Sequence, residues 1–118
     1  MAEIEGFTRQ TISCGEVALS VQIAGRGPDL ICLHGYPQNG MCWAKIAPVL
    51  ARHFRVIIPD LRGYGQSDAP ADDPGHSTYS KRQMARDIVA LMDALGIKAA
   101  MVLGHDRGAR VSYRLALD

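Results

Sequence analysis

The residues with the clearest chemical potential lie near the end of the chain, in the run Gly104-His105-Asp106-Arg107-Gly108. An apolar stretch leads directly into this Gly-x-Asp-x-Gly pattern, and a helical pattern follows it. The spacing is that of a nucleophile elbow, a sharp strand-to-helix turn that lifts its central side chain above the end of a sheet. Serine is the usual central residue, whereas this chain has Asp106. A carboxylate is ionised at neutral pH, so Asp106 can attack without a base and form an ester that water must then cleave.

Two arginines accompany this candidate nucleophile. Arg107 follows Asp106 directly, and Arg110 lies four residues after Asp106, on the same face of the expected helix. Guanidinium groups beside a helix N-terminus favour an anion, above all a carboxylate held by paired hydrogen bonds. The pattern therefore predicts an attacking carboxylate next to a site for an anionic substrate. The alternative interpretation is structural, with Asp106 as a helix N-cap and the arginines on the surface.

The elements that must position these residues follow from the apolar pattern upstream. Nearly continuous apolar runs are typical of strands covered on both faces, and alternation is typical of a half-exposed hairpin. An apolar stripe at helical spacing ends at a glycine after a capping box, and a proline marks the start of a second helix. The expected strands are a hairpin of two edge strands over 7–14 and 16–24, and buried strands over 29–33, 54–59 and 98–103. The expected helices are a first turn near Trp43 with a helix starting close to Pro48, a helix from about 80 to Gly96, and a last helix from Arg107.

This order predicts an α/β fold with a mainly parallel sheet and helices on both faces. Sites in such sheets form beyond the carboxyl ends of the strands, where segments 34–37, 60–65 and 105–107 are expected to meet. We expect His34 to line this site, mainly by shaping the turn that follows it. Asp60 and Arg62 are expected to hold their loop, and Trp43 is expected in the core.

Composition narrows the function classes. The chain has 118 residues, of which 47% are hydrophobic, and a net charge of +1. One globular unit fits this length, and no basic excess indicates a nucleic-acid partner. The three cysteines form no CxxC motif, so neither a disulfide framework nor a metal site is expected. The N-terminus does not resemble a secretory signal and no stretch is long enough to span a membrane, so we expect a cytoplasmic protein.

The assembled motifs resemble those of the α/β-hydrolase fold, and within it those of haloacetate (fluoroacetate) dehalogenases. The matching stretches are His34-Gly35-Tyr36-Pro37-Gln38, Pro59-Asp60-Leu61-Arg62-Gly63-Tyr64-Gly65, Tyr79-Ser80-Lys81-Arg82 and Gly104-His105-Asp106-Arg107-Gly108-Ala109-Arg110. The first two are shared widely in the superfamily, while an Asp nucleophile is shared with epoxide hydrolases. Dehalogenases and epoxide hydrolases with this nucleophile commonly carry tryptophan directly after the Asp, whereas this chain has Arg107, which favours the haloacetate branch.

The resemblance implies a mechanism. Asp106 would displace halide from a haloacetate, Arg107 and Arg110 would hold the substrate carboxylate, and the backbone N–H groups of Tyr36 and Arg107 would form the oxyanion hole. A small anionic haloacid and water would be the reactants, with no cofactor or metal. A homodimer is a further expectation from the family.

The family also implies residues that this sequence does not contain. In this fold the base histidine and its acid follow the nucleophile in chain order, but the sequence ends at Asp118, twelve positions after Asp106. We therefore expect residues 1–118 to be the N-terminal part of one α/β-hydrolase domain that ends just after the elbow helix and lacks the cap and the C-terminal part. Two alternatives remain open, an epoxide hydrolase with the same nucleophile and a catalytically silent fragment.

Overall fold

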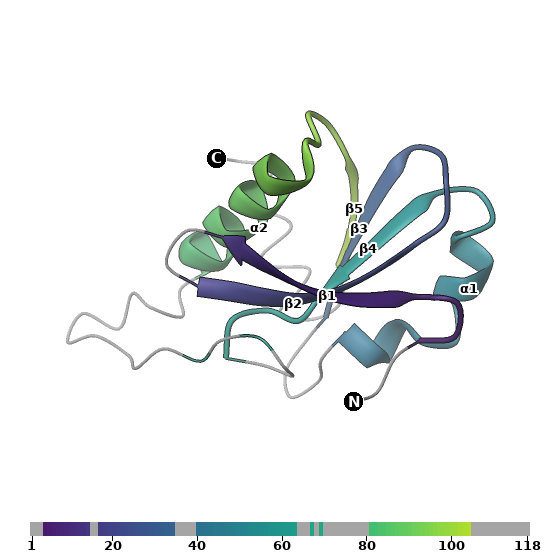
Figure 1. Ribbon diagram of the computed structural model, residues 1–118, viewed down its shortest axis with the longest axis horizontal. Helices are drawn as coiled ribbons and strands as arrows, with labels where there is room; N and C mark the ends of the chain where they lie inside the picture. Colours follow the sequence, from purple (N-terminus) through teal and green to yellow (C-terminus); the bar gives the residue numbers. More distant parts are fainter. Residues whose placement is uncertain are drawn as a thin grey trace.

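The computed structural model describes residues 4–14, 17–34, 40–63, 67, 69 and 81–104. Its sheet has five strands in the order β1-β2-β4-β3-β5 (Figure 1). β3 pairs in parallel with β4 and β5, whereas β2 pairs antiparallel with β1 and β4. This mixed sheet confirms the predicted α/β class. The elements are β1 (Thr8–Cys14), β2 (Val17–Ala24), β3 (Asp29–Leu33), the 3-10 helix η1 (Gly40–Trp43), α1 (Ala47–Leu50), β4 (Arg55–Pro59), α2 (Lys81–Leu95) and β5 (Met101–Gly104).

The predicted hairpin is confirmed, but the expectation that both of its strands lie at an edge was wrong. β1 is an outer strand, whereas β2 also pairs with β4, where Val21 lies opposite Pro59. Leu19 and Val21 of β2 are fully buried. Burial of these side chains favours a place inside the sheet, where a strand has a neighbour on each side.

The central strands supply two hydrophobic cores, one on each face of the sheet. Successive side chains of a strand point to opposite faces. Ile31 of β3 and Ile57 of β4 belong to the core beneath α2. Cys32 and Val56 belong to the core on the other face. Both faces are therefore apolar, as the continuous apolar runs in the sequence predicted.

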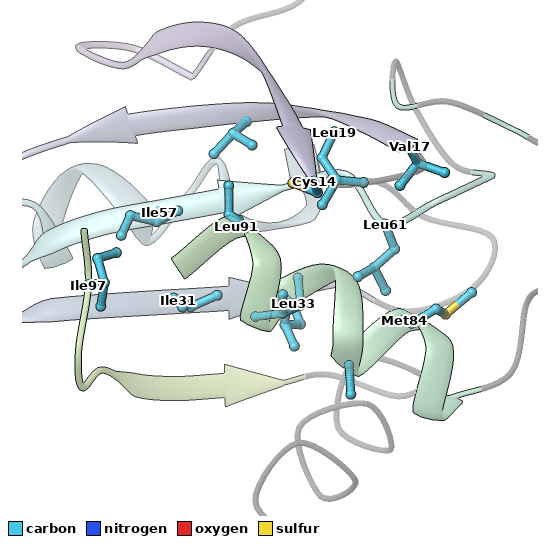
Figure 2. Packing of buried hydrophobic residues seen from close by; sticks show 13 residues of the cluster. Cys14, Val17, Leu19, Ile31, Leu33, Ile57, Leu61, Met84, Leu91 and Ile97 are labelled. Carbon is cyan, nitrogen blue, oxygen red and sulfur yellow. The ribbon is translucent and has the colours of Figure 1, made fainter. Parts of the chain in front are cut away.

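Helix α2 covers one of these faces through the predicted apolar stripe. Met84, Ile88 and Leu91 are each at most 2% exposed. Figure 2 shows Met84 and Leu91 on the same side of the sheet as Ile31 and Leu33 of β3. The apolar stripe therefore buries one face of α2 against the sheet, as its helical spacing predicted.

Helix α2 ends at the predicted glycine. Gly96 has φ = 71°, a left-handed conformation that favours glycine. Its N–H donates to the Asp93 carbonyl, and the Ile97 N–H donates to the Met92 carbonyl at 2.8 Å. These two bonds form a Schellman motif, which Ile97 completes by entering the core. The capping box expected at the other end begins at Ser80, which lies outside the described residues.

The opposite face is covered by η1 and α1, so helices lie on both faces as predicted (Figure 1). Trp43 is 7% exposed, which confirms its expected place in the core. Pro48 lies in the first turn of α1, where its missing N–H costs nothing because that donor would have no partner in the helix. The predicted helix start is therefore confirmed, although α1 has only four residues.

Strand β5 begins three residues later than the sequence predicted, at Met101 instead of Lys98. Its ladder with β3 starts where Met101 lies opposite Leu30. The two alanines before it have low β propensity and bring little side-chain contact to a pairing. The partner strand therefore sets this boundary, and the local apolar pattern does not.

Candidate active site

The three parallel strands end at one edge of the sheet, as predicted. Leu33, the last residue of β3, lies opposite Gly104, the last residue of β5. The chain therefore leaves these two strands at neighbouring points. His34 follows β3 directly, and Asp60 follows β4 directly. This carboxyl edge is the place where sites form in open parallel sheets.

Four predicted site residues, Tyr36, Asp106, Arg107 and Arg110, lie outside the described residues. Their roles as oxyanion donors, nucleophile and anion site remain predictions. The structure describes the frame around them, which consists of the strand ends, His34 and the segment that begins at Asp60.

His34 is fully buried at the carboxyl end of β3. Its Nε2 accepts a hydrogen bond of 2.9 Å from the Leu61 backbone N–H. An imidazole nitrogen that accepts an N–H bond carries no proton, so this bond assigns the proton to Nδ1. The contact joins the end of β3 to the segment after β4. The turn that His34 is expected to shape lies outside the described residues.

Arg62 anchors that same segment to helix α2. Its Nε and one of its terminal nitrogens donate to the two carboxylate oxygens of Asp87, at 2.6 and 2.7 Å. Both side chains are 3% exposed. A guanidinium fork on a carboxylate fixes both distance and orientation, so the segment cannot move independently of α2. The expectation that Arg62 is structural is confirmed.

Asp60 belongs to a second polar network, which fastens the segment to the hairpin. One Asp60 carboxylate oxygen lies 3.2 Å from an Arg9 terminal nitrogen, and that nitrogen also donates to the Ser20 hydroxyl at 2.7 Å. The Ser67 hydroxyl donates to the Asp60 carbonyl and accepts from the Ser20 N–H. Asp60 is 2% exposed, so its carboxylate is turned inward and its expected structural role is confirmed.

Sequence reasoning missed the partners Arg9, Asp87 and Ser67. A signal for Asp87 was present, because it falls on the same helical stripe as Met84 and Leu91. A charged residue on a buried stripe calls for a buried partner of opposite charge. Arg9 and Ser67 gave no comparable signal, because they stand in polar stretches of the sequence and interrupt no apolar stripe.

Cys14 lies in the core beneath α2, 5% exposed. Burial raises the pKa of its thiol from the ordinary value of 9.0, and the nearby Asp87 charge raises that pKa further. A hydrogen bond with the Leu19 backbone lowers it in part. A buried, protonated thiol is a poor nucleophile, which gives Cys14 a packing role.

The described residues contain neither a candidate group of metal ligands nor a candidate membrane-spanning helix. Within the part of the chain that the structure describes, no three His, Cys, Asp or Glu residues are grouped so that they could hold a metal ion. None of the helices in the described ranges combines the length and the apolar character needed to cross a membrane.

Comparison with known proteins decides the family. The family model of the alpha/beta hydrolase fold matches residues 28–118. The chain belongs to this family. The match begins just before β3 and extends through β5, so the three parallel strands and the segments that follow them lie within the matched residues.

Relatives named as a dehalogenase and as epoxide hydrolases both match this α/β-hydrolase chain. A fluoroacetate dehalogenase from Burkholderia sp. is 46% identical over 114 residues, which are 97% of this chain and 38% of that protein. An epoxide hydrolase from Caballeronia sordidicola is 35% identical over 95% of this chain and 33% of that protein. The crystal structure of an epoxide hydrolase from Vigna radiata has a TM-score of 0.89 and 34% identity, over 98% of this chain and 37% of that structure. The chain thus spans little more than a third of the length of these relatives.

Proposed function

We propose that the protein carrying this α/β-hydrolase chain cleaves the carbon–halogen bond of a haloacetate. Asp106 is the nucleophile, Arg107 and Arg110 bind the substrate carboxylate, and the backbone N–H groups of Tyr36 and Arg107 form the oxyanion hole. The base that activates water follows Asp106 in chain order, as the fold requires.

The observation that carries this proposal is the parallel pairing of β3 with β5, with Leu33 opposite Gly104. Tyr36 comes three residues after Leu33, and Asp106 comes two residues after Gly104. Two segments that start from neighbouring points of one sheet edge can bring an oxyanion donor to the ester of a nucleophile. The 46% identity to a fluoroacetate dehalogenase supports the choice of substrate.

The chemistry proceeds in two steps. One Asp106 carboxylate oxygen attacks the α-carbon, the carbon–halogen bond breaks, and the halide leaves with the bonding electrons. Water then adds to the carbonyl carbon of the resulting ester, and glycolate leaves as the Asp106 carboxylate is restored. The second step places negative charge on the carbonyl oxygen, where each oxyanion-hole donor typically contributes about 3 kcal/mol.

Epoxide hydrolysis is a second candidate, because relatives with that name match nearly the whole chain. It uses the same carboxylate attack on carbon. The two candidates differ in the charge of the substrate, and two arginines near the nucleophile favour an anion. Arg110→Ala is therefore expected to lower kcat/KM for chloroacetate about 10- to 100-fold, since it removes a charged hydrogen-bonding partner.

The test uses the full product of the gene that encodes these residues. It is incubated with chloroacetate or fluoroacetate, halide release is followed, and the intact mass is measured after rapid quenching. We expect free halide and a carboxymethyl ester adduct that maps to Asp106 and is absent in Asp106→Asn. Turnover of neutral epoxides that is indifferent to Arg110→Ala, with no halide from either haloacetate, would replace this proposal by the epoxide hydrolase.

A further inference from the structure

The carboxyl end of β3 is held differently on its two sides. On the β5 side the ladder continues to Leu33 and Gly104. On the β4 side the last register pair is Ile31 with Ile57. Continued in register, Leu33 would lie opposite Pro59, which has no N–H to donate. The strand ladder therefore stops short of the site edge on the β4 side.

At this point the imidazole of His34 connects the end of β3 to the segment after β4. Its Nε2 accepts the Leu61 N–H at 2.9 Å, in a position closed to water, since His34 is 0% exposed. The bond depends on the neutral imidazole with its proton on Nδ1, because an imidazolium has no acceptor at Nε2. A buried N–H that loses its acceptor is unfavourable, so this bond constrains where His34 can lie.

The other end of this bond is rigidly placed. The Leu61 side chain is 1% exposed and packs in the core with Met84 and Ile88 of α2. The next residue, Arg62, forks onto Asp87 of the same helix. His34 therefore accepts its hydrogen bond from a residue that is held on α2 by two contacts, the packing of the Leu61 side chain and the ion pair of Arg62 with Asp87.

We infer that His34 is a positioning residue for ester hydrolysis, acting through its hydrogen bond to the Leu61 N–H. This inference rests on the proposed function, in which Tyr36, two residues after His34 in the sequence, donates to the oxyanion. In ester formation Asp106 loses negative charge, so oxyanion donors give little acceleration. In ester hydrolysis negative charge returns to the carbonyl oxygen, so donor placement governs the rate.

Single-turnover experiments with chloroacetate on the full gene product separate the two steps by intact mass. His34→Leu keeps the volume and removes the acceptor, and we expect ester decay to slow about 10- to 100-fold while ester formation changes little. The ester then accumulates. His34→Gln places an amide oxygen within reach of the Leu61 N–H and is expected to restore most of the decay rate. His34→Asn, whose amide is one carbon shorter, is expected to resemble His34→Leu and replaces it if that variant does not fold.

Leu91→Ala is the matched control, because it weakens the same core beneath α2 without touching the site edge. It is expected to lower the unfolding temperature without accumulating ester. Equal slowing of both steps in His34→Leu, normal decay in that variant, or no restoration by glutamine would overturn the role of His34 alone. Absence of ester and halide with the unaltered protein would overturn the proposed function, and the role of His34 with it.

Discussion

Single residues at the site edge are constrained mainly by buried polar pairs. Arg62 and Asp87 are both 3% exposed and joined by two short hydrogen bonds. Such a pair contributes little net stability compared with apolar side chains of similar volume, because both charges lose their hydration. Removal of one partner is costly, because it leaves the other charge buried without compensation.

Asp87→Leu is therefore expected to destabilise the protein by about 3–5 kcal/mol, since it removes the carboxylate that faces the buried Arg62 guanidinium. The double variant Arg62→Met, Asp87→Leu is expected to recover most of this loss. Urea unfolding of the unaltered protein, the two single variants and the double variant measures the coupling between the residues. Additive losses in the double variant would show that the pair does not act as a unit.

Cys14 adds a pH dependence of known sign. Because burial raises its pKa above the ordinary value of 9.0, the folded state holds the proton more tightly than the unfolded state. Its contribution to stability is complete below pH 9 and is lost as the pH rises from there through the raised pKa of the folded state. We expect Cys14→Ala to show a shallower decline in unfolding free energy between pH 8 and about 10 than the unaltered protein. Parallel declines would contradict the assignment.

The sequence predicted which residues stand at the carboxyl edge of the sheet better than it predicted their hydrogen-bond partners. His34, Asp60 and Arg62 were placed at the correct edge because the strand ends that precede them could be read from apolar runs. Their contacts with Leu61, Arg9 and Asp87 could not be read in the same way. Those contacts depend on which distant segments pack together, and a local sequence pattern does not specify this packing.

Helices and strands were predictable where the local sequence pattern and the tertiary contacts favour the same boundary. β3 has the predicted bounds, Asp29–Leu33, and α2 ends at the predicted glycine. The two errors, the start of β5 and the place of β2 in the sheet, both depend on neighbouring strands. The late start of β5 follows from its ladder with β3, and the inner place of β2 follows from its pairing with β4. Strand order and strand ends are set by partners, which a single-sequence pattern does not name.

Two glycines that connect elements allow a test of local against tertiary constraint. At Gly96 a Cβ would meet nothing within 4 Å, so only its positive φ opposes substitution. At Gly27, also with positive φ, a Cβ would lie 2.6 Å from the His53 carbonyl oxygen. We expect Gly96→Ala to cost about 1–2 kcal/mol and Gly27→Ala clearly more, as measured by urea unfolding. Equal losses would mean that the turn at Gly27 rearranges at no cost.

At the scale of the whole molecule, the described sheet ends in two different outer strands, β1 and β5. β5 is the outer strand of the described sheet, next to β3. Met101 is 47% exposed and Leu103 is 40% exposed, which are high values for large apolar side chains in a strand. An outer strand with apolar side chains and free backbone groups is a template for pairing with another chain.

This open edge predicts how the 118-residue chain behaves in solution. We expect association that grows with concentration and that Met101→Lys reduces, because a lysine on an outer strand opposes edge-to-edge pairing. Val89→Lys is the matched control, since Val89 is 46% exposed but lies on α2. Light scattering after size exclusion, over a range of concentrations, compares the three chains. Equal suppression by both variants would assign the association to general surface hydrophobicity, and a monomer at every concentration would mean that the β5 edge is covered.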